Sequence, residues 1–169
     1  MKTVFLVFGI FISCSAYSKE DCSLSALHLN YKSNISESLY YTGTCHYRNK
    51  DYEKSAKAWQ QLAELNNVEK EYQHLQINVL NNLGYLMFFS LGIEKEQSKA
   101  ISYWKKAITL GQAESEYHLC HAYADRKEST YNREKAKMYC KKALLIYRGM
   151  KQKDEEILSQ IEKYYKRVK

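Results

Sequence analysis

The sequence predicts an all-α solenoid of about three antiparallel helix hairpins, with a leading helix and a C-terminal capping helix. The main observation is a pattern that occurs twice, over residues 83–107 and 119–143, at an offset of 36 residues. A fixed period of this size is typical of repeat proteins, whose units stack to bury their apolar faces. The chain also has no Pro and only six Gly, which favours helices. The matched positions are Leu83 and Leu119, Gly84 and Cys120, Lys99 and Lys135, Ala100 and Ala136, Tyr103 and Tyr139, Trp104 and Cys140, Lys105 and Lys141, Lys106 and Lys142, and Ala107 and Ala143.

Residues 1–18 have the three parts of a secretory signal peptide. Lys2 gives a basic start, Thr3 to Ile12 is an apolar run, and Ala16-Tyr17-Ser18 has the form of a cleavage site. The apolar run is shorter than the roughly 20 residues that a membrane span needs. We therefore expect an exported protein, periplasmic or secreted, with one helical-repeat domain over residues 19–169.

The same segment allows a second interpretation. Phe11-Ile12-Ser13-Cys14 resembles a bacterial lipoprotein box, in which Cys14 becomes a lipidated N-terminus. The first position of that motif is normally Leu, and Phe11 weakens the match. Contact with a membrane is expected only if Cys14 is lipidated.

Residues 21–32 predict a short leading helix. Leu24, Leu27 and Tyr31 fall at helical spacing, and Asp21 is available as an N-cap. Ser33-Asn34 is expected to end this helix.

Three helix hairpins are predicted over about 36–66, 76–110 and 113–149, each with a polar break between two amphipathic stretches. The first hairpin keeps the register of the later ones, because Gly43 corresponds to Gly84 and Trp59 to Trp104. A small residue lets two antiparallel helices approach closely, and the large ring fills the wider part of the hairpin.

The second unit closely resembles the Sel-one-like repeat, a relative of the tetratricopeptide repeat with a longer loop between its helices. The resemblance rests on Leu83-Gly84, on Ser90-Leu91-Gly92-Ile93, on the run from Lys99 to Ala107, and on Gly111. The third unit is similar but has Cys120 in place of the small Gly, and the first is similar to a plain tetratricopeptide. The resemblance covers about residues 37–149 and implies a solenoid that binds other proteins.

A capping helix is predicted over about 152–168. Its apolar side chains form one stripe, and such a helix shields the last apolar face of a stack. A basic amphipathic helix can also lie on a membrane surface, but an array of hairpins needs a cap, and we favour that interpretation. The stripe consists of Ile157, Leu158, Ile161, Tyr164, Tyr165 and Val168.

Four cysteines remain outside the leader, and in an exported chain an even number suggests disulfides. Three pairings are possible, and we favour the local ones, Cys22 with Cys45 and Cys120 with Cys140. The repeat register supports the second pair further, because Cys120 and Cys140 occupy the positions of Gly84 and Trp104, which face each other in a hairpin.

Without the leader the chain carries 25 basic and 19 acidic residues, a charge of +6. Such a surface can attract acidic partners, anionic lipid or a polyanionic envelope polymer. A solvated basic helix face is the simpler interpretation, and we favour it.

The sequence contains no glycine-rich phosphate loop, no nucleophile elbow and no zinc-protease motif. The densest cluster of reactive side chains is His118, Cys120 and His121 with Cys140. Adjacent residues of a helix point about 100° apart, so Cys120 and His121 cannot easily share one zinc ion. We interpret the cluster as a disulfide beside two surface histidines, and we expect no enzyme activity, no metal and no cofactor.

The resemblance implies that the first helix of each hairpin lines a concave groove. Such a tyrosine-rich groove suits an extended peptide or a partner's helix, although several of its residues could instead pack against the capping helix or a neighbouring hairpin. The residues selected by register are Tyr40, Thr44, Tyr47 and Arg48, then Asn81, Tyr85, Phe88 and Phe89, then Tyr117, His121, Ala124 and Asp125.

We therefore expect a non-enzymatic, monomeric bacterial protein that binds another protein through its concave face, as an envelope adaptor or as an inhibitor or immunity protein of a toxin, and that binds no nucleic acid. The rival hypothesis is a cell-wall-binding, peptidoglycan-binding or β-lactam-binding protein with weak hydrolase activity, since some cysteine-rich secreted relatives are associated with such binding. Those relatives carry a regular cysteine pair in every repeat. The second unit here has none, which counts against this hypothesis.

Overall fold

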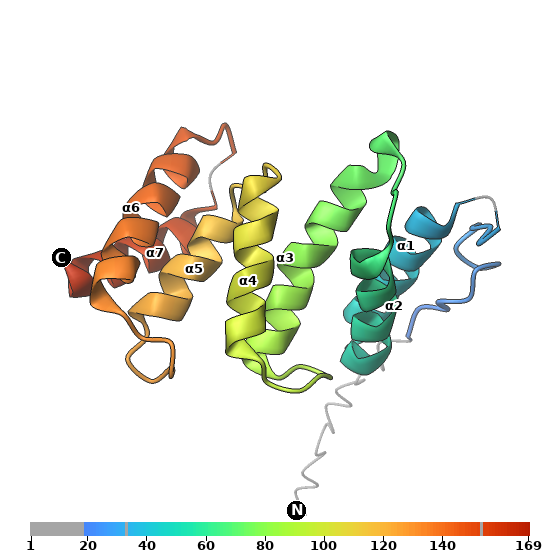
Figure 1. The fold of residues 1–169 in the computed structure, drawn as a ribbon, viewed down its shortest axis with the longest axis horizontal. Helices are drawn as coiled ribbons and strands as arrows, with labels where there is room; N and C mark the ends of the chain where they lie inside the picture. The colour runs from blue at the N-terminus through green and yellow to red at the C-terminus, as the bar shows by residue number, and fades with distance from the viewer. Residues whose placement is uncertain (1–18, 33, 153) are drawn as a thin grey trace, which may run out of the picture.

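The computed structural model describes residues 19–32, 34–152 and 154–169, so the predicted signal peptide and Cys14 lie outside the described residues. The described part contains helices and no strand, and it confirms the all-helical solenoid. The helices follow one another as stacked hairpins (Figure 1). They are α1 (Ile35–Arg48), α2 (Tyr52–Glu64), the short 3-10 helix η1 (Lys70–Tyr72), α3 (Gln73–Phe89), α4 (Gln97–Thr109), α5 (Ser115–Ala124), α6 (Arg133–Gly149) and α7 (Glu155–Val168).

Each hairpin packs along its length and then against the next one. Helix α1 pairs with α2, α3 with α4, and α5 with α6, while α3 packs on α2 and α5 on α4. Helix α7 packs on both α6 and α5, as the first helix of a fourth unit would. It therefore closes the end of the stack (Figure 1).

Three of the helices begin at a polar side chain that accepts a backbone hydrogen bond. Asn34 accepts from the N–H of Glu37, Asn132 from that of Lys135, and Asp154 from that of Ile157. Each cap satisfies an N–H group that the first helical turn leaves unpaired. Helix α1 thus begins at Ile35, one residue before the predicted start of the first hairpin at about residue 36.

The second hairpin is held at close range by a contact between Gly84 and Trp104. A Cβ atom on Gly84 would lie 2.5 Å from Nε1 of Trp104, so no larger residue fits without movement. The same indole N–H donates a hydrogen bond of 3.0 Å to the carbonyl oxygen of Asn81. Trp104 is 1% exposed and is one of the largest fully buried side chains.

At the equivalent positions the first hairpin has the same kind of pair, whereas the third has a different one. In the first, Gly43 lies against Trp59, whose indole donates a 3.3 Å hydrogen bond to the carbonyl oxygen of Tyr40. In the third, Cys120 and Cys140 form a disulfide. This bond therefore replaces the glycine–tryptophan contact of the other two units, as the register predicts.

We expect Gly84→Ala to lower the free energy of unfolding by about 2 kcal/mol, because the added methyl group displaces the Trp104 indole and its hydrogen bond to Asn81. Urea unfolding measures the change. Gly149→Ala is the matched control, since a Cβ atom on this helical glycine meets nothing within 4 Å. Equal losses in both variants would contradict a specific contact with Trp104.

The N-terminal segment corrects one prediction, because residues 19–32 form turns and no helix. The Asp21 carboxylate accepts from the N–H of Ser23, and the Ser23 hydroxyl accepts from that of Ala26. Such short polar side chains compete with helical hydrogen bonds. His28 also has a positive φ of 54°, which stops helical propagation.

A disulfide between Cys22 and Cys45, the other predicted pair, ties this segment to α1. Backbone contacts add to it, since the Asn49 amide donates to the carbonyl oxygen of Glu20 at 2.8 Å and accepts from its N–H at 2.9 Å. The Arg48 guanidinium also contacts the Glu20 carboxylate at 2.8 Å. The segment is therefore anchored at the outer edge of the first hairpin.

The loops between paired helices differ in length, as the resemblance of the first unit to a tetratricopeptide and of the second to a Sel-one-like repeat implies. Three residues separate α1 from α2, whereas seven separate α3 from α4. Gly92 in the longer loop has a φ of +65°, and its Cα faces the backbone of Tyr52 and Glu53 at the start of α2. Among the described residues, no helix is long and apolar enough to span a membrane.

Candidate binding pocket between the first two hairpins

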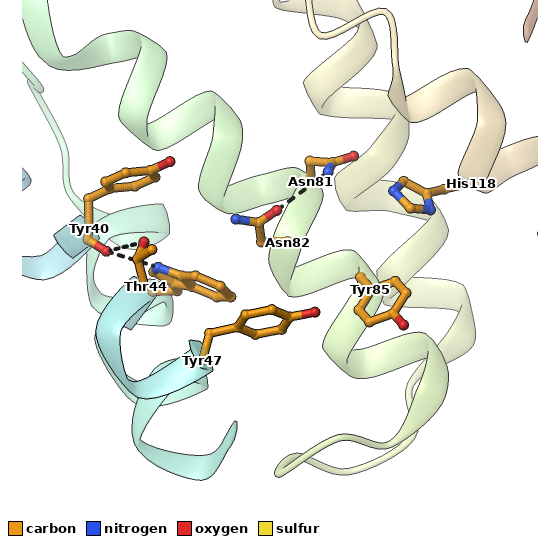
Figure 2. Close-up of a pocket in the computed structure, with 8 residues that line it drawn as sticks. Tyr40, Thr44, Tyr47, Asn81, Asn82, Tyr85 and His118 are labelled. Atoms are coloured by element: carbon orange, nitrogen blue, oxygen red, sulfur yellow. Dashed lines mark hydrogen bonds between the residues drawn. The ribbon is translucent and has the colours of Figure 1, made fainter. Parts of the chain in front are cut away.

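A pocket of about 310 Å³ opens where α1 faces α3. We call it the tyrosine–asparagine pocket, after the side chains that line it (Figure 2). Its position follows from the stack, because α1 and α3 are the first helices of successive hairpins. The lining residues are Tyr40, Thr44 and Tyr47 of α1, Trp59 of α2, Asn81, Asn82 and Tyr85 of α3, and His118 of α5.

The aromatic wall of the pocket is held by ring contacts. Tyr47 packs against Trp59 with 5.6 Å between ring centroids, and its hydroxyl points toward Tyr85 (Figure 2). Burial, with smaller contributions from Tyr85 and Tyr52, raises the pKa of Tyr47 above its usual value of 10. Tyr47 is therefore a neutral phenol that can donate or accept a hydrogen bond.

Two neighbouring amides form the polar part of the pocket. The side-chain oxygen of Asn81 accepts a 2.7 Å hydrogen bond from the hydroxyl of Ser115. Its NH₂ group donates to the Asn82 oxygen over 3.5 Å, a long contact. Asn82 itself points toward α1 (Figure 2). Its NH₂ group donates to none of the described residues and can serve a ligand.

His118 forms the far side of the pocket, and it corrects the prediction of a surface histidine. Its ring stacks on Trp104 with 5.0 Å between centroids and 14° between planes, and it is partly buried. Burial, with a smaller contribution from His121, lowers the pKa of His118 from 6.5 to about 4. The imidazole is therefore neutral at physiological pH.

The pocket as a whole is neutral. None of its eight lining residues is an Asp, Glu, Lys or Arg. Within the described part of the chain, no group of three or more His, Cys, Asp or Glu side chains could hold a metal ion. The arrangement suits binding by ring stacking and neutral hydrogen bonds.

The structure brings together five of the residues predicted for the concave groove, namely Tyr40, Thr44, Tyr47, Asn81 and Tyr85. It does not bring in Arg48, which pairs with Glu20 at the outer edge of the first hairpin. Phe88 was also placed wrongly in the groove. It is 0% exposed and packs against Trp104 in the core, 5.3 Å between ring centroids.

The predicted groove residues of the third unit lie in a separate environment, because α7 packs on α5. The Tyr117 hydroxyl donates a 3.0 Å hydrogen bond to Gln160. The His121 ring meets Tyr164, with 3.4 Å between Nδ1 and the hydroxyl oxygen. Asp125 follows the end of α5, where its carboxylate accepts from the N–H of Lys127 in a turn. Phe89 contacts His121, and Ala124 is buried in the core.

Sequence reasoning missed Trp59, Asn82 and His118. Trp59 was assigned only to packing between helices, although its ring edge reaches the pocket. Asn82 and His118 occupy the same register, two residues before Gly84 and before Cys120. A polar residue recurring at that position was a signal that could have identified both.

The comparison with protein families found the Sel1 repeat, which matches residues 34–67, 78–112 and 113–145, more than half of the chain. The three matched segments correspond to the three hairpins in order. A search of curated proteins and a search of solved structures found no match.

Proposed function

Because the chain belongs to the Sel1 repeat family, whose repeats generally mediate protein–protein interaction, we propose that it binds a segment of a partner protein in the tyrosine–asparagine pocket. The observation that supports this most directly is the neutral lining of the pocket, with tyrosine rings and amides from two hairpins. The protein acts by binding, as an adaptor or an inhibitor, without chemistry of its own.

The lining defines the chemistry of the partner segment. Rings of Tyr47 and Tyr85 offer apolar faces, and the amide of Asn82 offers hydrogen bonds to a peptide backbone. A charged side chain would lose its hydration here without gaining an opposite charge. We therefore propose an uncharged, extended segment that inserts an aromatic or aliphatic side chain, since the volume suits one or two side chains.

The proposed place of action is outside the cytoplasm. Two disulfides suggest an oxidising extracellular or periplasmic environment, because cytosolic thiols are kept reduced. A signal peptide over residues 1–18, removed on export, is consistent with them. The proposed form is a monomer of residues 19–169, or a lipid-anchored protein if Cys14 is the processed end.

Replacing Tyr47 and Tyr85 together with Phe tests the pocket while keeping its rings. We expect partner affinity to fall about tenfold, because two hydrogen bonds to the segment are lost. A phage library of random peptides, selected on the immobilised oxidised protein, supplies ligands. Calorimetry with the tightest peptide then measures the affinity. Selected peptides are expected to share an uncharged core.

Tyr131→Phe is the matched control, because this tyrosine is 37% exposed and lies outside the pocket in the loop before α6. Its affinity for the selected peptide is expected to equal that of the unchanged chain. Peptides with an acidic or basic core, or affinity unaffected by the double substitution, would show that binding takes place elsewhere.

A further inference from the structure

The outward face of α6 carries two exposed apolar side chains, which the proposed function does not use. Met138 is 45% exposed and Leu145 is 68% exposed. They are seven residues apart, so they lie on one line of the helix, separated by about 10 Å along its axis. Leu145 is the most exposed of the large hydrophobic side chains in the described residues.

Basic residues lie on both sides of this line. At 100° per residue, Lys141 falls on one side of it, with Lys137 beyond, and Lys142 and Lys135 fall on the other. Helix α6 has six basic residues and one acidic residue, Glu134. Lys137 and Lys141 form no ion pair with any described residue, whereas Lys142 contacts Glu116 at 3.6 Å.

Helix α4 provides an internal comparison, because the repeat places the same lysines on it. Lys99, Lys105 and Lys106 correspond to Lys135, Lys141 and Lys142. The line between them is polar in α4, however, with Ser102 and Thr109 where α6 has Met138 and Leu145. The apolar line is thus a feature of α6 and not of the repeat.

We propose that the outward face of α6 docks on an anionic lipid surface. The lysines contact acidic headgroups, and Met138 and Leu145 enter the boundary between headgroups and acyl chains. A basic face that is merely solvated, the simpler interpretation of the sequence, does not account for the two exposed apolar side chains. A soluble polyanion would likewise need only the lysines.

The position of this face is compatible with partner binding. Helix α6 and helix α1 lie toward opposite ends of the stack (Figure 1). The tyrosine–asparagine pocket is lined by residues of α1, α2, α3 and α5, so docking through the outward face of α6 uses none of its lining residues. This proposal does not depend on the identity of the partner, nor on lipidation of Cys14.

Flotation with phospholipid vesicles tests the proposal. We expect the oxidised chain to bind vesicles that contain phosphatidylglycerol about tenfold more tightly than vesicles of phosphatidylcholine, and to lose this preference in high salt. Met138→Ser with Leu145→Thr, which gives α6 the outward line of α4, is expected to reduce binding about tenfold. All variants carry the same N-terminus, so any contribution of residues 1–18 cancels.

Two further variants separate the contribution of the lysines from that of the apolar side chains. Lys137→Gln with Lys141→Gln is expected to weaken binding to acidic vesicles to a similar extent, while Lys54→Gln with Lys57→Gln on α2 leaves it unchanged. Binding to soluble polyphosphate is expected to be insensitive to the Met138 and Leu145 changes. The proposal would be overturned by equal binding to both vesicle types or by unchanged binding of the Met138→Ser, Leu145→Thr variant. It would also be overturned if the protein self-associates and this variant does not.

Discussion

Cys120→Ala with Cys140→Ala is expected to lower the free energy of unfolding by about 3 kcal/mol. The disulfide spans 20 residues, and in the chain-entropy account its removal enlarges the unfolded ensemble by about that amount. Both residues are 0% exposed, and the third hairpin has no glycine–tryptophan pair to hold its helices together. Urea unfolding under non-reducing conditions measures the loss, with the slope fitted separately for each protein because the unfolded chain is less compact without the bond.

The bond between Cys22 and Cys45 gives the comparison, because it spans a similar 23 residues. Its removal is expected to cost less. None of residues 19–32 is fully buried, so this segment gains freedom in the folded state as well as in the unfolded state. Equal losses for the two pairs would mean that the N-terminal segment is as much a part of the core as α5 and α6.

The repeat register explains why the hairpins and this disulfide could be predicted. Positions that recur at a fixed offset face each other in the same way within every hairpin, so the sequence alone matches Cys120 and Cys140 to Gly84 and Trp104. The contact between Gly84 and Trp104 then determines how closely the helices approach. Local sequence is sufficient here, because each unit contacts only its neighbours.

The register failed to predict the groove residues of the third unit, because the helix that packs beside this unit differs from the one beside the first. Tyr117 and His121 have the register of Asn81 and Tyr85, but α7 packs beside them and bonds to them through Gln160 and Tyr164. Their place in the repeat does not reveal this, because α7 lies after the three repeats from which the register was taken. Between α1 and α3 the equivalent side chains line the pocket instead.

The failures at the edges of the array have a physical cause of another kind. Leu24, Leu27 and Tyr31 are at helical spacing, yet the chain turns instead. The side chains of Asp21 and Ser23 accept hydrogen bonds from backbone N–H groups there. A pattern of apolar residues indicates a helix only when a face exists to bury it. Residues 19–32 contact one hairpin at its edge and are held there by the bond to Cys45.

His118 gives the second large prediction, a loss of stability in acid. Its pKa of about 4 in the folded state lies below the 6.5 of an unperturbed histidine. Because the folded-state value is the lower one, this group stabilises the fold fully above pH 6.5, and the stabilisation is lost as the pH falls toward 4. Linkage gives a decrease of about 3 kcal/mol in the free energy of unfolding between pH 7.5 and pH 4.

His118→Phe isolates this contribution, because a phenyl ring can stack on Trp104 and does not titrate. Urea unfolding between pH 7.5 and pH 4 is expected to show a shallower decline for this variant than for the unchanged chain. The neighbouring His121, whose pKa is also lowered by burial, and all of the carboxylates remain in both proteins, so the difference in slope belongs to His118. If the free energy of unfolding declined equally in both proteins, the imidazole would accept a proton while still stacked on Trp104. The far wall of the pocket would then be open to water.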